Sequence, residues 1–204
     1  MTLGSPVTPG RIVIISGPSG AGKSTIVRRL LADCPLPLTL SVSATTRKPR
    51  PGESHGVEYF FLSHEEFARR RELGEFLECK EVFGRGDWYG TLREQVTTGL
   101  AEGKWIILEI DVEGAQAVID QHPEAITIFL HSGTLEELER RLRGRGTDSE
   151  DAIQRRLEVA RRELTCVERY RYQVVNDIPD EAVRRICSVL LDNTNPIRRT
   201  VVEN

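Results

Sequence analysis

An eight-residue segment near the N-terminus has the residue types and spacing of a phosphate-binding loop. Residues 17–24 read GPSGAGKS and match the pattern G-x-x-x-x-G-K-[ST] in full. Glycines let the backbone curl so that several N–H groups point at one anion, and a following helix adds the partial positive charge of its N-terminus. Lys23 is expected to reach the β- and γ-phosphates of a nucleoside triphosphate, and the Ser24 hydroxyl to ligate Mg²⁺.

The position of this segment in the chain supports the same interpretation. Residues 11–16 (RIVIIS) form a short β-branched run that predicts a buried strand, and residues 23–33 carry apolar side chains at helical spacing. A glycine-rich turn that only joins a strand to a helix is the alternative, and the full motif with correct flanks disfavours it. The segment leaves the phosphoryl acceptor open: water, a protein, a nucleotide or a small molecule.

A second group of residues could hold another phosphate and read a base. Arg47 and Arg50 lie in a proline-flanked loop and can fork onto a dianionic phosphate, while Tyr59 and Tyr89 supply hydroxyl donors. Glu78 only accepts hydrogen bonds when ionised, so it suits guanine, which presents donors at N1 and N2. A solvated basic turn and core aromatic rings are the ordinary alternatives for the arginines and tyrosines. For Glu78 taken alone, an exposed strand carboxylate is the default interpretation.

The elements that must position these residues alternate along the chain. Buried strands are predicted at 11–16, 38–43, 105–110, 126–130 and 172–176, and helices at 23–33, 92–101, 113–120, 135–143, 150–167 and 180–191. Capping-box spacing places helix starts at Thr91 and Thr134, and Pro179 suits a first helical turn. This alternation predicts an α/β fold, a parallel sheet with helices on both faces. Residues 44–90 interrupt it with short strands (58–62, 76–79) around a helix at 63–73, and the segment 144–149 (GRGTDS) joins two arginine-rich helices.

Composition narrows the class of protein. The 204 residues carry a formal net charge of −3, which argues against a protein that coats nucleic acid. Only four of the 28 basic residues are lysines, so arginine, the residue for forked contacts to phosphate, predominates. We expect no signal peptide and no membrane span, and we expect the four cysteines to be reduced thiols of a cytoplasmic protein. Residues 1–9 and 193–204 are expected to be loose tails.

Ordered blocks along residues 11–191 resemble the guanylate kinase family. These blocks are SVSATTRKPRPGE at 41–53, FLE at 76–78, YGT at 89–91, RGT at 145–147 and VN at 175–176. The resemblance implies transfer of the γ-phosphoryl group of ATP to GMP, or to dGMP, with Mg²⁺. It also implies a single domain with a P-loop three-layer core (about 10–43, 91–135 and 168–192), a small mixed α/β GMP-binding insert (about 44–90) and a helical lid (about 136–167).

The resemblance also implies a role for each matching residue. The ATP contacts are expected at Gly17, Pro18, Ser19, Gly20, Ala21, Gly22, Lys23, Ser24, Thr25 and Asn176, with Ser24 also on the metal. The GMP contacts are expected at Ser43, Arg47, Arg50, Tyr59, Glu78, Tyr89, Thr91 and Glu109. The catalytic cations are expected at Lys23, Arg47, Arg141, Arg145 and Arg156. Glu109 stands where the family often has aspartate, so it can approach the base, the metal shell or a lid arginine.

Two alternatives remain at this stage. Some guanylate-kinase-like domains are non-catalytic interaction modules with degraded phosphate loops, whereas Lys23 and Ser24 are in place here. A kinase of the same fold could act on a ribose bisphosphate, against which Glu78, Ser43 and Thr91 favour a guanine base. The leading hypothesis is therefore a cytoplasmic, monomeric or homodimeric enzyme of purine metabolism that recycles GMP.

Overall fold

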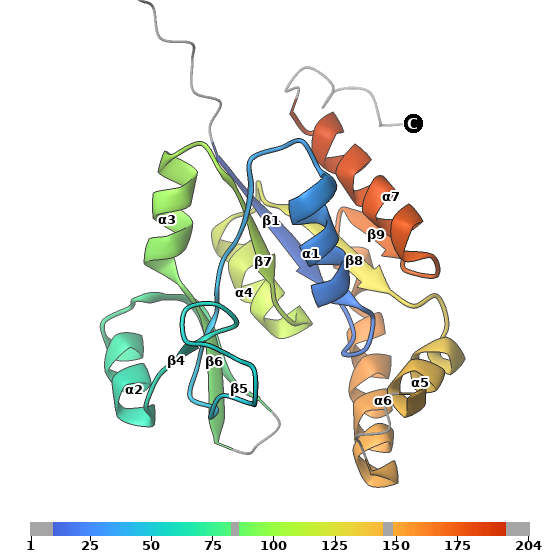
Figure 1. Cartoon of the computed structure of the whole chain (residues 1–204), viewed down its shortest axis with the longest axis horizontal. Helices are drawn as coiled ribbons and strands as arrows, with labels where there is room; N and C mark the ends of the chain where they lie inside the picture. Colours follow the sequence, from blue (N-terminus) through green and yellow to red (C-terminus); the bar gives the residue numbers. More distant parts are fainter. Residues whose placement is uncertain (1–9, 83–85, 145–148, 195–204) are drawn as a thin grey trace, which may run out of the picture. The chain divides into compact units, whose positions relative to one another are not determined.

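A computed structural model describes residues 10–82, 86–144 and 149–194 of the chain (Figure 1). The strands are β1 (Arg11–Ser16), β2 (Leu38–Leu40), β3 (Ala44–Thr45), β4 (Phe60–Phe61), β5 (Phe76–Val82), β6 (Asp87–Leu92), β7 (Trp105–Glu109), β8 (Ile126–His131) and β9 (Tyr172–Val175). The helices are α1 (Lys23–Asp33), α2 (His64–Glu72), α3 (Arg93–Ala101), α4 (Val112–Gln121), α5 (Leu135–Gly144), α6 (Glu150–Leu164) and α7 (Pro179–Asp192), with a 3₁₀ turn at Val167–Arg169.

A five-stranded sheet with the order β2-β7-β1-β8-β9 carries the central strands. Strands β1, β7 and β8 are runs of Ile, Val, Leu and Phe that are buried almost throughout, as expected for strands covered on both faces. Strands β8 and β9 pair in parallel, with Ile128 opposite Tyr172 and His131 opposite Val175. The predicted α/β fold with a parallel-strand sheet is confirmed.

A smaller sheet with the order β4-β3-β6-β5 is built from the segment that interrupts the alternation. Strands β5 and β6 form an antiparallel pair, in which Glu78 lies opposite Thr91. Helix α2 begins at its N-cap Ser63, whose hydroxyl accepts a hydrogen bond from the Glu66 N–H, and it packs on β5 through Phe67. The Phe67 ring stacks on Phe76 at 4.3 Å between centroids, which anchors the helix to the sheet.

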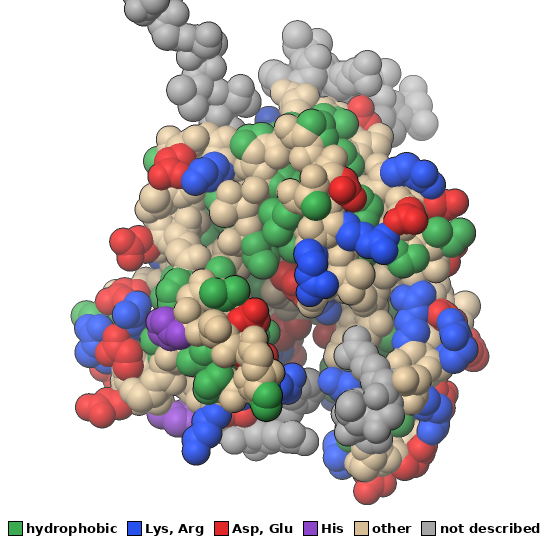
Figure 2. All heavy atoms as spheres, viewed as in Figure 1, with side chains coloured by type: hydrophobic (Ala, Val, Ile, Leu, Met, Phe, Trp, Pro, Cys, Tyr) green, Lys and Arg blue, Asp and Glu red, His purple; other side chains and the backbone are tan. Residues whose placement is uncertain are grey.

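Two compact units make up the chain. Among the described residues, the first unit comprises 10–13, 39–82, 86–108 and 113–125 and holds the smaller sheet, β7, α2, α3 and α4. The second comprises 14–38, 109–112, 126–144 and 149–194 and holds α1, β8, β9, α5, α6 and α7. In the second unit α5 and α6 lie side by side around Leu138, Leu142, Ile153 and Leu157, and α1 packs against α7. Charged side chains of both signs are interspersed over α5 and α6 (Figure 2).

Several predicted boundaries need correction. The Thr91 capping box is wrong, because Thr91 belongs to β6 and the N-cap of α3 is Leu92, which makes no side-chain cap. The predicted strand at 38–43 is shorter in the structure and ends at Leu40, although the Ser41 N–H still donates to the Ile107 carbonyl of β7 (2.9 Å). The Thr134 start is confirmed by a hydrogen bond from the Glu137 N–H to its hydroxyl (3.2 Å), and Pro179 is the first residue of α7.

Within the described ranges, every helix is too short or too polar to cross a bilayer.

Candidate active site

The loop between β1 and α1 has the geometry of an anion cradle. Gly17, Gly20 and Gly22 adopt positive φ values of 137°, 97° and 91°, which residues with a Cβ rarely adopt. A Cβ on Gly17 would lie 2.0 Å from the Leu130 carbonyl oxygen, so the loop also needs glycine for space. Gly22 is the N-cap of α1 and offers no side-chain acceptor, so the first N–H groups of the helix point at the loop, where an anion would satisfy them.

Lys23 folds over this loop. Its ammonium donates hydrogen bonds to the carbonyl oxygens of Gly17 (2.6 Å) and Pro18 (3.2 Å). Burial lowers the pKa of Lys23, whereas the nearby carboxylates of Glu163, Glu109 and Asp111 act in the opposite direction, Glu163 most strongly. A triphosphate in the cradle would add negative charge beside the ammonium and favour its protonated form.

The end of β7 contributes a carboxylate to the cradle. The exposed Ser24 hydroxyl donates a 2.5 Å hydrogen bond to Oε1 of Glu109, the last residue of β7. A hydroxyl and a carboxylate oxygen are the hard ligands that Mg²⁺ prefers, and Mg²⁺ in nucleotide sites is held by one or two protein groups with phosphates and waters. The pair fits a Mg²⁺ ion bound with a triphosphate. This contact favours the metal-shell role for Glu109 over a role at the guanine base.

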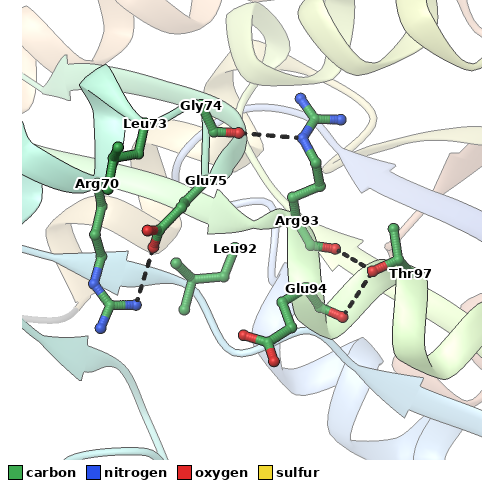
Figure 3. A pocket seen from close by; sticks show the side chains of 8 residues that line it. All are labelled: Arg70, Leu73, Gly74, Glu75, Leu92, Arg93, Glu94 and Thr97. Atoms are coloured by element: carbon green, nitrogen blue, oxygen red, sulfur yellow. Dashed lines mark hydrogen bonds and ion pairs between the residues drawn. The ribbon is translucent and has the colours of Figure 1, made fainter.

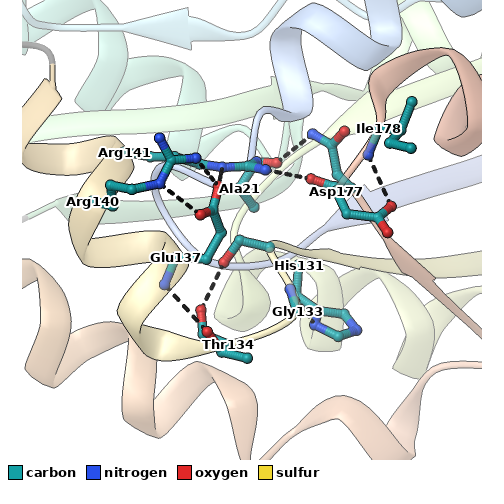
Figure 4. Close-up of polar contacts among 11 residues, drawn as sticks. Ala21, His131, Gly133, Thr134, Glu137, Arg140, Arg141, Asp177 and Ile178 are labelled. Carbon is teal, nitrogen blue, oxygen red and sulfur yellow. Dashed lines mark hydrogen bonds and ion pairs between the residues drawn. The ribbon is translucent and has the colours of Figure 1, made fainter.

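A chain of hydrogen bonds ties α5 to the cradle (Figure 4). Glu137 accepts from Nε of Arg141 (2.7 Å) and from the guanidinium of Arg140, and Arg141 Nη2 donates to the Asn176 backbone carbonyl (2.6 Å). The buried Asn176 side chain donates through Nδ2 to the Ala21 carbonyl (2.7 Å). Asn176 therefore links the Arg141 guanidinium to the phosphate loop through two hydrogen bonds.

The loop between β3 and β4 holds the guanidinium of one arginine in a fixed orientation. Arg47 makes a bidentate ion pair with Glu53 (2.9 and 3.0 Å), and its Nε donates to the Tyr89 hydroxyl (3.1 Å). The Arg47 guanidinium also lies over the Tyr59 ring, 5.3 Å from its centroid. Hydrogen bonds to Glu53 raise the pKa of Arg47 further above its ordinary value, and those from Arg47 lower the pKa of Glu53. The loop lines a pocket of about 730 Å³ in which Arg50 is exposed.

The β5–β6 pair presents the predicted base-reading carboxylate. The buried hydroxyl of Thr91 donates to Oε1 of Glu78 (2.7 Å), and the two residues are cross-strand partners. This hydrogen bond fixes the orientation of the carboxylate. The half-buried Ser43 precedes β3 in the same sheet, and its carbonyl accepts from the Phe60 N–H (2.9 Å).

The structure groups the predicted residues into two sets. The triphosphate set, in the second unit, comprises residues 17–25, Glu109, Arg141 and Asn176; the monophosphate set, in the first unit, comprises Ser43, Arg47, Arg50, Tyr59, Glu78, Tyr89 and Thr91. Arg156 is half-buried on α6. Arg145 lies outside the described residues.

Sequence reasoning assigned no role to Glu53, although it belongs to the quoted segment 41–53. Its carboxylate holds the Arg47 guanidinium and also accepts from the Arg50 backbone N–H (2.7 Å), so it fixes one arginine side chain and the backbone at the other. The signal was its position three residues after Arg50 beyond Pro-Gly, where a turn brings the carboxylate back to the loop. Glu113, to which the sequence patterns give no role, forms an ion pair with Lys80 (2.9 Å).

A second pocket is lined by none of the predicted site residues. It has a volume of about 360 Å³ and is lined by the end of α2, Gly74, Glu75 and the start of α3 (Figure 3). Arg70 lies 3.7 Å from Glu75, and Arg93 Nε donates to the Gly74 carbonyl (3.4 Å). Its arginines thus serve the local fold, and we assign no ligand to it.

The strand, glycine loop, lysine and helix described above define a P-loop nucleotide-binding protein of the α/β class. Three comparisons name the family. The family model described as "Guanylate kinase" matches residues 9–193. A curated guanylate kinase of Rhodopirellula baltica is 63% identical over 90% of this chain and 88% of its own, and one of Synechococcus sp. (strain JA-3-3Ab) is 48% identical over 91% and 84%. The crystal structure of guanylate kinase from Anaplasma phagocytophilum matches with a TM-score of 0.76 at 32% identity over 95% of this chain and 92% of that one. The chain belongs to the guanylate kinase family.

Proposed function

We propose that this protein is an ATP:GMP phosphotransferase that converts ATP and GMP to ADP and GDP. The observation that carries the proposal is the complete phosphate cradle, with Lys23 on the Gly17 and Pro18 carbonyls, in a chain of the guanylate kinase family. A cradle that keeps its glycines, lysine and hydroxyl has the groups that triphosphate binding requires.

The GMP phosphate is proposed to bind at the Arg47 loop. Arg50 supplies an exposed guanidinium, Arg47 supplies a cation whose fork is held by Glu53, and Tyr59 and Tyr89 supply hydroxyls. Glu53 already holds the Arg47 guanidinium in one orientation, which reduces the conformational entropy lost when the phosphate binds.

The guanine base is proposed to be read by Glu78, with Ser43 and Thr91 beside it. A carboxylate has two acceptor oxygens and room for several hydrogen bonds, so Glu78 can accept from guanine N1–H and N2–H while Thr91 holds Oε1. Adenine presents an acceptor at N1, which would face the carboxylate without a proton. Sites of this kind discriminate by up to about 10⁴-fold.

ATP is proposed to bind along residues 17–25 with Mg²⁺ at Ser24, supported by Glu109. The ion, when bound, neutralises charge on the β- and γ-phosphates. Arg141 is proposed to lie over the triphosphate, and Arg145 and Arg156 to join it. Asn176 is proposed to lie near the adenine ring, consistent with its contact to the cradle at Ala21.

The transfer step needs positioning and charge neutralisation more than a base. An oxygen of the GMP phosphate is already deprotonated near neutral pH, so it attacks the γ-phosphorus in line without a dedicated general base. Lys23 and the guanidinium groups stabilise the negative charge spread over the phosphoryl oxygens. Exclusion of water, proposed as the role of the segment 136–167, would suppress hydrolysis of ATP.

The two alternatives predict different outcomes at these same residues. A non-catalytic interaction module has no need for Lys23 and Ser24, and a ribose bisphosphate kinase has no need for the Glu78–Thr91 pair. We further propose that the enzyme works in the cytoplasm, where both nucleotides are available, and recycles GMP in purine nucleotide metabolism, as a monomer or homodimer.

An ADP-release assay with a set of acceptors tests the proposal. Purified full-length protein with ATP and Mg²⁺ is given GMP, dGMP, IMP, AMP, UMP or a ribose bisphosphate, and ADP is measured over time. We expect rapid release with GMP and dGMP, weak release with IMP, which lacks the N2 donor pair, and none above background with AMP or UMP. The absence of GMP-dependent ADP would refute the proposal, and release with a ribose bisphosphate would support the other kinase.

A further inference from the structure

Two cysteines that are far apart in the sequence meet in the second unit. The thiol of Cys187, on α7, lies 2.7 Å from the sulfur of Cys34, the C-cap residue of α1. Both are free thiols; Cys34 is 8% exposed and Cys187 is half-buried. A disulfide requires the sulfurs to approach to about 2.05 Å, so a small movement of the side chains brings them to bonding distance.

The packing of α1 on α7 holds this pair together. A second contact joins the same helices, the ion pair of Arg29 with Asp180. Arg29 precedes Cys34 along α1, and Asp180 precedes Cys187 along α7, so the two helices run in the same direction with their register set at two points. The helix packing therefore brings the two cysteines together, and their side-chain rotamers complete the sulfur contact.

We propose that Cys34 and Cys187 form a reversible intramolecular disulfide when the protein meets a low-molecular-weight disulfide. The thiolate of Cys187, the more accessible of the two, attacks one sulfur of the reagent, which forms a mixed disulfide and releases one thiol. The Cys34 thiolate then attacks Sγ of Cys187, forms the internal bond and releases the second thiol. Two protein thiols are oxidised and one reagent disulfide is reduced to two thiols.

The other two cysteines lack this arrangement and provide controls. Cys79 lies in β5 of the first unit, and the Cys166 sulfur lies 3.9 Å from the Arg162 carbonyl oxygen.

Burial and the Cys34 thiol raise the pKa of Cys187 to about 12. Cys187 therefore reacts slowly near neutral pH, and a mildly alkaline buffer suits the experiment.

The proposed bond has a consequence for stability. It closes a sequence separation of 153 residues, which restricts the unfolded chain far more than a short loop would. It also joins the helix that starts at the phosphate cradle to the helix that starts after Asn176. We expect the oxidised protein to unfold at a temperature higher than the reduced protein by about 5–15 °C.

The test uses the full-length protein and oxidised glutathione as the probe. After incubation and alkylation of the remaining thiols, intact mass and non-reducing peptide mapping report which cysteines are linked. We expect a loss of two hydrogen atoms, a single cross-linked peptide pair containing Cys34 and Cys187, the higher unfolding temperature, and full reversal by dithiothreitol.

Three variants separate the proposal from other outcomes. Cys187→Ser and Cys34→Ala should each abolish the internal cross-link and the temperature shift while leaving ADP release from ATP and GMP unchanged, whereas Cys79→Ser should keep both effects. Both cysteines of the proposed pair are replaced in separate variants, so that instability of one variant does not prevent the comparison. Glutathione adducts on Cys79 or Cys166 with Cys34 and Cys187 still alkylated, in folded protein, would overturn the proposal.

Discussion

At the scale of single residues, the cradle combines a lysine, a hydroxyl and backbone N–H groups. The Lys23 ammonium is held by two carbonyl oxygens, and the Ser24 hydroxyl by Glu109. These contacts preorganise the groups that a triphosphate and Mg²⁺ require, so that little reorganisation accompanies binding.

We predict that Lys23→Ala lowers kcat by at least about 10²-fold, because it removes a cation from the charge that develops on the phosphoryl group. The fold should survive, since the side chain bonds only to the loop beside it. Steady-state ADP release and thermal unfolding measure the two effects. Lys104→Ala, which removes a surface lysine paired with Glu102, is the matched control, and near-normal turnover of Lys23→Ala would contradict the assignment.

We predict that Glu78→Gln raises the KM for GMP roughly 10- to 100-fold and changes the KM for ATP little. The amide keeps the shape but replaces an acceptor with a donor that faces the guanine donors. Glu81→Gln, on the same strand β5, serves as the control because Glu81 binds the Gly86 N–H instead. Equal changes in the two KM values would show that Glu78 does not read the base.

At the scale of elements, the loop from β1 to α1 is fixed by steric constraints as much as by its sequence motif. Gly17 has no room for a Cβ because the backbone of β8 lies against it. Leu138 and Leu142 of α5 lie against Gly20, where a Cβ would come within 3.0 Å of each side chain. Helix α5 thereby carries Arg141 to the cradle.

We predict that Gly17→Ala costs about 3 kcal/mol or more of stability, from the positive φ and the contact with the Leu130 carbonyl. Gly52→Ala also meets a positive φ but has open space, so it should cost only about 1 kcal/mol. Urea unfolding of the two variants gives both values. If Gly17→Ala were no less stable than Gly52→Ala, the close approach of β8 would be refuted.

The helix pair α5–α6 is joined by an ion pair whose strength depends on pH. Arg143 binds both carboxylate oxygens of Glu150 (2.5 and 2.7 Å), which lowers the pKa of Glu150 to about 2. Because the pKa of Glu150 is lower in the folded state, the ion pair stabilises the folded protein at pH values above the ordinary pKa of 4.5. That stabilisation is lost as the pH falls toward 2. The pair is exposed, so the effect is small and is screened by salt.

We therefore predict that Glu150→Gln slightly lowers the unfolding temperature at pH 7 and that the difference from wild type vanishes near pH 2. Calorimetry or circular dichroism across this range measures it. Glu158→Gln, on the exposed face of α6, should leave the profile unchanged. A difference that persists unchanged to pH 2 would rule out the ion pair as its source.

At the scale of the whole molecule, arginine is abundant but balanced. The formal net charge is −3, and Arg143, Arg155, Arg161 and Arg162 are exposed on α5 and α6 among acidic side chains (Figure 2). The arginines expected at the site are less exposed: Arg47 and Arg141 are half-buried and pair with Glu53 and Glu137.

We predict that the full chain binds RNA with a Kd weaker than about 10⁻⁴ M at physiological salt. A protein with a negative net charge neutralises few RNA phosphates and therefore releases few of the counterions bound to the RNA. Fluorescence anisotropy with a labelled oligonucleotide measures this, with a basic protein of similar size as the positive control. Micromolar binding that weakens with added salt would reveal a basic surface that the net charge hides.

Local sequence patterns determined the elements and the chemistry of the cradle. Residues 11–16 form the predicted strand and 23–33 the predicted helix, because apolar periodicity and a glycine-rich turn act within a few residues of chain. The motif at 17–24 and the ordered blocks also determined the family. Thr91 shows the limit of local patterns: its spacing suits a helix cap, but pairing with β5 keeps it in a strand and turns its hydroxyl to Glu78.

Which side chains meet depends on the tertiary packing. It placed Glu109 on Ser24 and Arg141 on the Asn176 carbonyl, joined Glu53 to Arg47 through the turn between them, and brought Cys34 to Cys187. Three of these four contacts join residues far apart in the chain, and they exist because strands and helices pack in one register. Sequence spacing carries no information on that register, because it follows from the burial of whole apolar faces rather than from any single motif.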